Sequence, residues 1–260
     1  MNQYNQPYSQ TDRLAEAPLY LSPLMGASIK GDTSSLFCQA AVANGYLTDD
    51  QMLHAAIRYQ LTTSDDGGVI FWQADRQGKV RDGKIMFYRD DCHRDHDHTP
   101  DWIVSRMRRQ HLSIPADHKS EHCLFGLHLL SPDFYPQVGN APKTVAIVEA
   151  EKTAVICSEL FPDYLWMASG GLTELNVSKL MPLEDLQLIL FPDTDPEGTA
   201  YRRWHEVAEA ASDVFGHPVT ISSLLEQRAT PAQKAAKIDL IEFLDLGHPA
   251  DPPSDLLTFI

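Results

Sequence analysis

The sequence predicts an α/β protein in which a parallel β-sheet flanked by helices is preceded by a smaller α+β subdomain with a β-hairpin. In the second half of the chain, four short apolar runs alternate with segments of helical character. That alternation is typical of βαβ units, which build parallel sheets covered on both faces. In the first half, two strand-like runs flank the short turn Arg76-Gln77-Gly78. This pattern indicates a hairpin.

The strands of the second half are recognised as continuous apolar runs, as expected for a sheet that is buried on both faces. They are TVAIVEA (144–150), YLWMAS (164–169), LQLILF (186–191) and VTISSL (219–224). Helices are expected between them at 151–161, 173–180 and 196–216. The last helix has Pro196 at its start and Gly216 at its end, which is the usual asymmetry of helix boundaries.

The first half is predicted to combine helices with the hairpin. A helix is expected from residue 33 or 34 to 44, and another from Thr48, where Thr48 and Gln51 form a capping box. The hairpin strands are GVIFWQAD and KVRDGKIMFY, which ends at Tyr88. We therefore divide the chain into a flexible tail (1–30), an α+β N-terminal subdomain (31–140) and the parallel-sheet domain (141–260).

Composition restricts the function classes. The net charge of −15 argues against tight binding to nucleic acid through electrostatics alone, because that binding normally relies on clustered cations. No apolar run is long enough to cross a bilayer, and the opening MNQYNQPYSQ is polar, so a cytoplasmic protein with no membrane partner is expected. The four cysteines are far apart, with no CxxC pair. We therefore expect reduced thiols, with neither a zinc ribbon nor a disulfide framework.

Acidic residues follow two of the predicted strands. Glu149 closes the first strand, and Asp193 and Asp195 follow the third, in FPDTDPEG. Ligands of parallel sheets gather at the carboxyl ends of the strands. Residues two apart in an extended segment point to one side, so Asp193 and Asp195 are expected to face one cation, with Glu149 approaching it. Such carboxylates suit Mg²⁺, with Mn²⁺ as an alternative.

A fourth acid, Asp239 in AKIDLIEFL, is expected to follow the last strand and to join this cluster. Each of these features also has a purely structural interpretation. A DxD pair is common on acidic surfaces, and an acid such as Glu149 often begins a helix. Their placement after strands of one predicted sheet favours a functional interpretation.

At this point the sequence resembles a known family. VAIVEAEKTAVI is similar to the first motif of Toprim domains, and ASGG resembles the glycine turn after their second strand. LILFPDTDPEGTAYRRW resembles their DxD motif, and AKIDLIEFL is a weaker match to their late acidic motif. RDGKIMFY and CLFGLHLL resemble segments that precede the Toprim unit in bacterial (DnaG-like) primases, in particular small primase-like proteins of phages and mobile elements.

The resemblance implies a Toprim-type sheet and Mg²⁺-dependent nucleotidyl transfer that makes primers on single-stranded nucleic acid. Glu149, Asp193 and Asp195 would be catalytic and would hold the metal together with Asp239. The residues that would bind nucleic acid or nucleotide are Arg81, Lys84, Lys152, Gly170 and Gly171. The implied partners are a single-stranded DNA template, nucleoside triphosphates, and a helicase or other replication protein. For Arg81 and Lys84 the alternative is a solvated hairpin face.

Other functions compete with this interpretation. A Toprim nuclease would use the same metals, and a non-catalytic nucleic-acid-binding accessory protein of a mobile element would agree better with the acidity. A phosphatase of the haloacid-dehalogenase type also uses DxD, but after the first strand of its sheet. The segment CHRDHDH (92–98) has zinc-binding residue types; a charged loop is the favoured interpretation.

Overall fold

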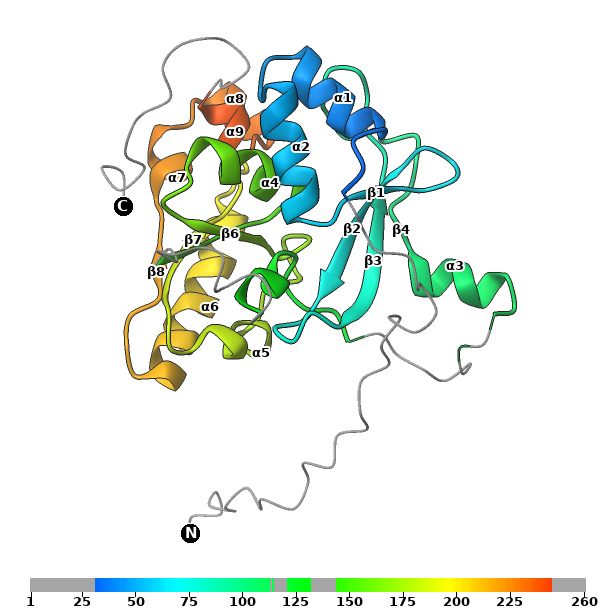
Figure 1. The fold of residues 1–260 in the computed structure, drawn as a ribbon. Coiled ribbons are helices and arrows are strands. Elements are labelled where there is room, and N and C mark those ends of the chain that lie inside the picture. Colours follow the sequence, from blue (N-terminus) through cyan, green and yellow to red (C-terminus); the bar gives the residue numbers. More distant parts are fainter. Residues whose placement is uncertain (1–30, 113, 115–120, 132–143, 245–260) are drawn as a thin grey trace, which may run out of the picture.

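The computed structural model describes residues 31–112, 114, 121–131 and 144–244, so the predicted tail lies outside the described residues. Two four-stranded sheets form the framework, with strand orders β1-β2-β3-β4 and β6-β5-β7-β8 (Figure 1). The first is antiparallel and the second is parallel. The predicted α/β class, with a hairpin-containing sheet preceding a parallel sheet flanked by helices, is confirmed.

The antiparallel sheet is built around the predicted hairpin. Its strands are β1 (Thr62–Thr63), β2 (Val69–Ala74), β3 (Val80–Met86) and β4 (Asp101–Trp102). The turn between β2 and β3 is held by the Asp75 carboxylate, which accepts hydrogen bonds from the backbone N–H groups of Gln77 and Lys79 at 2.9 and 3.0 Å. Gly78 completes the turn at a φ of +74°, which glycine adopts without strain.

In the described part of the chain, three helices accompany this sheet. They are α1 (Leu36–Ala43), α2 (Asp49–Arg58) and α3 (Ile103–Arg109). The capping box at the start of α2 is confirmed, because the Thr48 hydroxyl accepts from the Gln51 N–H while the Gln51 side chain accepts from the Thr48 N–H.

The parallel sheet has the four strands that the apolar runs predict. They are β5 (Thr144–Val148), β6 (Leu165–Ala168), β7 (Gln187–Phe191) and β8 (Thr220–Ile221). β5 lies between β6 and β7, and each neighbouring pair is parallel. The carboxyl ends of β5 and β7 are therefore adjacent.

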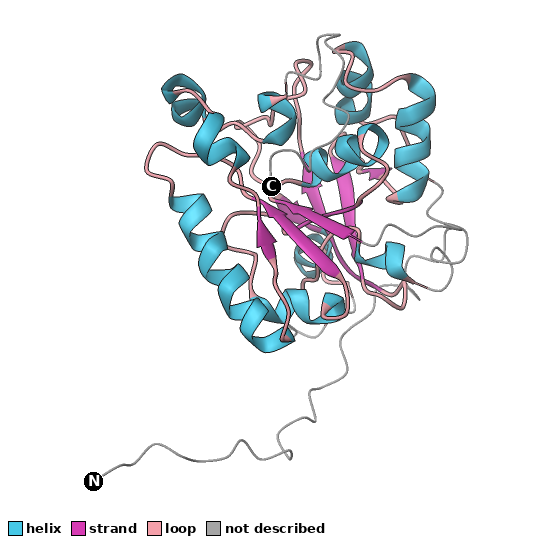
Figure 2. Cartoon of the chain, turned by 90° about the vertical axis from the view of Figure 1, so that its left-hand side faces the viewer, coloured by secondary structure: helices cyan, strands magenta, loops and turns pink. Residues whose placement is uncertain are grey.

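Helices cover both faces of the parallel sheet (Figure 2). They are α4 (Glu151–Leu160), α5 (Val177–Leu180), α6 (Thr199–Phe215), α7 (Leu224–Arg228) and α9 (Leu240–Phe243), with 3-10 turns at Leu127–Leu130 and Met181–Leu183. The short helix α8 (Pro231–Ala236), between α7 and α9, has no buried residue. Among the helices in the described part of the chain, none combines the length and apolar character needed to cross a membrane.

Three predicted helix starts are wrong. α1 begins at Leu36 rather than at residue 33 or 34, because the Ser35 side chain caps it by accepting from the Cys38 N–H. α5 begins at Val177 rather than at residue 173, because the Asn176 side chain caps it by accepting from the Lys179 N–H. α6 begins at Thr199 rather than at Pro196, because the preceding residues form a turn that ends at Gly198 with a φ of +63°. Its predicted end at Gly216 is confirmed, with a φ of +73°.

Alternate residues of the parallel strands point into two separate cores, as the period of two requires. Ala146 and Val148 pack with α1, α2, α4 and α9. Val145 and Ile147 pack on the other face, where Trp204 of α6 is fully buried. A third cluster, which includes Trp72, lies between the hairpin and α3. The buried Trp72 and Trp204 therefore serve packing.

The two sheets are joined through the first of these cores, which contains residues of both halves of the chain. Phe125 and Ala168 exchange backbone hydrogen bonds of 2.9 and 3.1 Å, and the Tyr59 hydroxyl donates to the Trp166 carbonyl at 2.9 Å. This junction fixes β3 beside the carboxyl edge of the parallel sheet.

His128 is buried in this junction, and its titration gives a testable stability effect. Its Nε2 lies 3.0 Å from the Arg58 carbonyl, and burial lowers the pKa of His128 from 6.5 to about 4. Between pH 6.5 and pH 4, His128 is therefore protonated in the unfolded chain but neutral in the folded chain. The unfolding free energy falls as the pH drops through this range.

We expect this histidine to account for about 2 kcal/mol of the loss in unfolding free energy between pH 7 and pH 5. Urea denaturation of the wild type and of His128→Gln at both pH values measures the effect. The variant should lose less stability on acidification. An equal loss in both proteins would show that His128 is not responsible.

Candidate active site at the carboxyl edge of the parallel sheet

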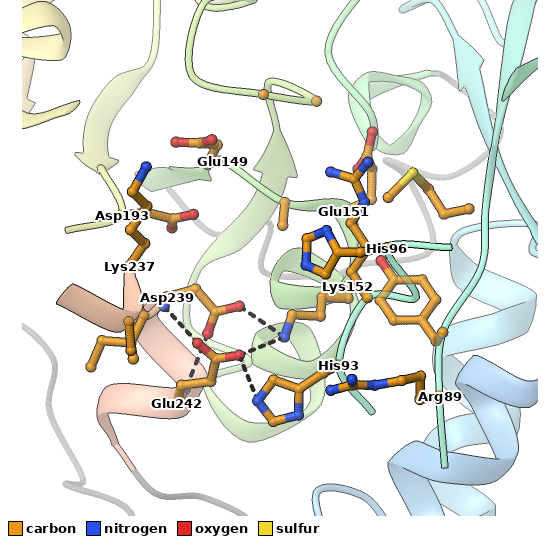
Figure 3. A pocket seen from close by; sticks show the side chains of 18 of the residues that line it. Arg89, His93, His96, Glu149, Glu151, Lys152, Asp193, Lys237, Asp239 and Glu242 are labelled. Carbon is orange, nitrogen blue, oxygen red and sulfur yellow. Dashed lines mark hydrogen bonds and ion pairs between the residues drawn. The ribbon is translucent and has the colours of Figure 1, made fainter. Parts of the chain in front are cut away.

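A cavity of about 640 Å³ opens where β5 and β7 end. One side is formed by the exits of these strands and by the turn before α9, and the other by β3 and the loop that follows it (Figure 3). The charged and histidine side chains that line it are Lys84, Arg89, His93, Arg94, His96, Glu149, Glu151, Lys152, Asp193, Lys237, Asp239 and Glu242.

Glu149 and Asp193 lie together in this cavity, as predicted from the adjacent strand ends. Burial raises the pKa of Glu149 to about 7, and the negative charges of Asp239 and Glu151 add to the effect. Asp193 remains partly accessible from the cavity but is otherwise enclosed by protein atoms; this burial, followed by repulsion from Glu149, raises its pKa well above the ordinary value. Burial and mutual repulsion thus make it costly for both acids of this pair to be ionised at once.

Asp195 is placed differently. Its Oδ1 accepts from the backbone N–H groups of Glu197 and Thr199 at 3.0 Å each, and its Oδ2 accepts from Ala200 at 2.7 Å. Burial alone would raise the pKa of Asp195, but these three hydrogen bonds outweigh it and lower the pKa. Asp195 does not line the cavity. Its carboxylate therefore organises the start of α6 and does not face Glu149.

Asp239 lines the cavity. It was expected directly after the last strand, but in the structure it follows the short helix α8. It caps α9 by accepting from the Glu242 N–H at 3.0 Å. Its other oxygen accepts from the Thr153 hydroxyl at 2.9 Å and lies 3.2 Å from Lys152 Nζ. Asp239 is thus already paired, unlike the other two acids.

The expected convergence of three carboxylates on one ion is not present in the described residues. No group of three or more His, Cys, Asp or Glu side chains there is close enough to hold a metal ion. The reason is the turn after β7, which folds Asp195 back onto the amides of α6 and leaves Glu149 and Asp193 as a pair.

Two lysines in the cavity are held by carboxylates. Lys84 Nζ lies 3.1 Å from Glu151 and donates to the Gly170 carbonyl at 2.7 Å. Lys152 Nζ lies 3.2 Å from Asp239 and 3.1 Å from Glu242. Burial alone would lower the pKa of Lys152, but the charges of these two acids raise it well above its usual range. Both lysines are therefore fixed cations in the cavity wall.

Arg81 lines a second cavity, of about 610 Å³, and not the first. Its guanidinium lies 3.5 Å from Asp75 and 3.4 Å from Glu121. Residues three apart on a strand point to opposite faces. This parity separates Arg81 from Lys84, although the sequence suggested that both face the same ligand.

The loop after β3 supplies cavity residues that the sequence interpretation missed. Within this charged loop, Tyr88 and Arg94 form a β-bridge and the Asp95 N–H donates to the Phe87 carbonyl at 2.9 Å. These contacts fold the loop back, so that Arg89, His93, Arg94 and His96 line the cavity. The available signal was the position of this arginine- and histidine-containing segment directly after the strand that carries Lys84.

The same loop contains the residues considered for zinc. Cys92 is buried in the main core, whereas His93 Nε2 lies 3.3 Å from Glu242 and His98 Nδ1 lies 2.7 Å from Asp95. The cysteine and these two histidines thus point to different surroundings.

Gly170 and Gly171 form the part of the cavity wall that follows β6. Gly170 has a φ of +90°, and a Cβ there would lie 3.2 Å from Glu151 Oε1. An alanine at this φ costs about 1–2 kcal/mol in backbone strain. Gly170→Ala should lower the unfolding free energy by more than this, because the new Cβ also meets Glu151. Gly78→Ala is the matched control, since Gly78 has a similar φ of +74° with nothing within 4 Å. Equal losses of unfolding free energy in the two variants, measured by urea denaturation, would show that Glu151 moves aside and that its contact with the new Cβ adds no cost.

Solved primase structures show similar folds at low identity. The primase fragment of the bacteriophage T7 primase-helicase protein is 17% identical, with a TM-score of 0.46, and the match covers 74% of this chain and 65% of that one. A DnaG primase catalytic domain bound to ssDNA is 18% identical (TM-score 0.45; 86% and 77% covered). The E. coli primase catalytic core is 19% identical (TM-score 0.41; 79% and 62% covered). Likeness at this level says nothing about the chemistry of this chain.

No curated protein matches the sequence. A family model does match, over residues 39–194, which include the hairpin, the loop after β3 and both acids of the pair in the cavity. The chain belongs to the family described as Domain of unknown function (DUF6371).

Proposed function

We propose that this protein is a Toprim-type, primase-like nucleotidyltransferase that uses Mg²⁺ to make primers on single-stranded DNA. The observation that supports this most is the pair formed by Glu149 and Asp193, at the ends of adjacent parallel strands in a cavity that also contains fixed cations. The proposal includes nucleoside triphosphates as substrates. It also includes a helicase or other replication protein of a mobile element as partner.

The donor set fits Mg²⁺. Both acids have raised pKa values because they are buried and repel one another, and a divalent cation would remove that repulsion. Mg²⁺ binds through one or two carboxylates, with waters and substrate phosphates completing its shell. Two protein ligands are therefore enough. When bound, the ion would neutralise charge on the phosphates and help to position them.

The two ion-paired lysines of the cavity, Lys84 and Lys152, would position substrate. Lys84 is held by Glu151 and Gly170 as a fixed positive charge beside the acids. Lys152, Asp239 and Glu242 form an ion-paired group that supports the turn before α9. Because these groups are held by their neighbours, they need little reorganisation when substrate binds.

In the proposed reaction the 3′-hydroxyl oxygen of a primer forms a bond to the α-phosphorus of a nucleoside triphosphate. The bond from that phosphorus to the bridging oxygen breaks, pyrophosphate leaves, and the hydroxyl proton passes to solvent. The chemistry requires positioning and stabilisation of phosphate charge more than a protein nucleophile.

A primer-synthesis assay on single-stranded templates, with Mg²⁺ or Mn²⁺ and labelled nucleotides, tests the proposal. New labelled oligomers are expected from the wild type and not from Glu149→Gln. Shortening of a labelled DNA strand without nucleotides would instead indicate a nuclease. Neither product, together with DNA binding, would indicate the accessory protein that the net charge of −15 favours.

A further inference from the structure

The charges in the cavity fall into two groups when each is matched with its partner. Lys84 is paired with Glu151, and Lys152 is paired with Asp239 and Glu242. At the edge of the cavity, His93 contacts Glu242 and Arg89 contacts Asp91, at 3.3 and 2.9 Å. These side chains are therefore paired within the protein.

The second group has no such partners. Within the described residues, Arg94, His96 and Lys237 line the cavity with no side-chain hydrogen bond or ion pair. Glu149 and Asp193 likewise have no cation within ion-pair distance in this part of the chain. The cavity thus contains three nitrogen-bearing side chains and two acids that have no oppositely charged partner among the residues that the structure describes. Such a surface is complementary to a ligand that carries negative charge and a bound cation.

These three side chains extend from backbone that is held in place. Arg94 takes part in the β-bridge with Tyr88, and His96 follows the Asp95 N–H, which is bonded to Phe87. Lys237 has a φ of +55° in the turn before α9, and the next residue in that turn accepts from the Thr194 N–H at 3.2 Å. Figure 3 shows His96 on the side of the loop after β3 and Lys237 on the side of Asp193.

We propose that Arg94, His96 and Lys237 hold the polyphosphate tail of a nucleoside triphosphate whose metal-bound phosphates face Glu149 and Asp193. The inference rests on the proposed function and names the part of the cavity that binds the leaving pyrophosphate. Arginine and lysine both bind phosphate oxygens through charge-assisted hydrogen bonds, and His96 adds a ring N–H donor.

A nucleotide tail fits this cavity better than a nucleic-acid backbone does. A polyphosphate concentrates several negative charges within a volume that suits a cavity of about 640 Å³, which is within the size range of small-molecule sites. A backbone spreads its charges along a strand and usually requires a long basic surface, whereas the chain has a net charge of −15.

The test is calorimetric binding of Mg²⁺-ATP, Mg²⁺-pyrophosphate, AMP and a twelve-residue oligothymidylate to the full chain. Arg94→Gln and Lys237→Gln should each weaken ATP and pyrophosphate binding about tenfold and leave AMP and oligothymidylate binding unchanged. Arg89→Gln is the matched control, because Arg89 lines the same cavity but is paired with Asp91; less than a twofold change is expected.

The outcomes separate this inference from the proposed function. ATP binding that depends on Arg94 and Lys237 in a protein that makes no primers would support the inference and contradict the function. Primer synthesis by a protein whose ATP binding is unaffected by both variants would support the function and contradict the inference. Weaker oligothymidylate binding with unchanged ATP binding would assign these cations to nucleic acid and overturn the inference, as would the absence of ATP and pyrophosphate binding in the wild type.

Discussion

Replacing Asp193 with asparagine is expected to abolish Mg²⁺-dependent primer synthesis, with a loss of at least about a hundredfold, while the fold becomes no less stable. The side chain keeps its shape and loses the charge that would bind the ion. Burial and repulsion from Glu149 raise the pKa of Asp193 well above its ordinary value. The folded state therefore loses stability as the pH rises above the pKa that Asp193 has in the unfolded chain.

Two measurements on the same protein test this prediction. Asp193→Asn should unfold in urea at pH 8 with a free energy equal to or above that of the wild type, and should yield no primers. Glu197→Gln is the matched control, since Glu197 is an exposed acid in the same turn, and it should remain active. An active Asp193→Asn protein would remove this residue from the mechanism.

Replacing Asp195 with alanine should destabilise the fold, unlike Asp193→Asn, with a loss of about 2–3 kcal/mol in unfolding free energy. Three backbone N–H groups at the start of α6 would lose their acceptor. For a chain of this size, the melting temperature should fall by about 5–10 °C.

The pH dependence of this effect has a defined sign. The three hydrogen bonds lower the pKa of Asp195 from 3.8, so its contribution is present above that value and is lost as the pH falls below it. Asp213→Asn, at an exposed position of the same helix, is the thermal-unfolding control and should change little. An Asp195→Asn protein that is fully stable but inactive would instead favour the ligand role that the sequence suggested.

Much of the framework could be predicted because its signals are local. The strands of the parallel sheet are continuous apolar runs, and the capping box at Thr48 and Gln51 depends on residues only three apart. The placement of Glu149 and Asp193 could also be predicted, because parallel strands that are neighbours in the sheet end at the same edge.

The role of Asp195 was not predictable from strand periodicity. β7 ends at Phe191, so residues 193 and 195 belong to a turn, where the alternation of a strand no longer applies. The turn is set by the hydrogen bonds of Asp195 and by the positive φ of Gly198. The position of Asp239 was also not predictable from strand patterns, because two short helices, α7 and α8, separate it from the last strand.

The arrangement of Arg94 and His96 in the cavity depends on contacts between segments that are distant in sequence. Arg94 and His96 follow β3, whereas the acids that they approach follow β5 and β7. The junction between the two sheets, through contacts such as that of Phe125 with Ala168, helps to bring them together. The parity of β3, which separates Lys84 from Arg81, was readable in the sequence once the strand was assigned.

The most direct test of the central claim is a Mn²⁺ titration followed by electron paramagnetic resonance, with the wild type, Glu149→Gln and Asp193→Asn. If these two side chains share one divalent ion, the wild type should bind Mn²⁺ at one site that is lost in both variants. Unchanged Mn²⁺ binding in either variant would contradict a shared metal site at the carboxyl edge of the parallel sheet.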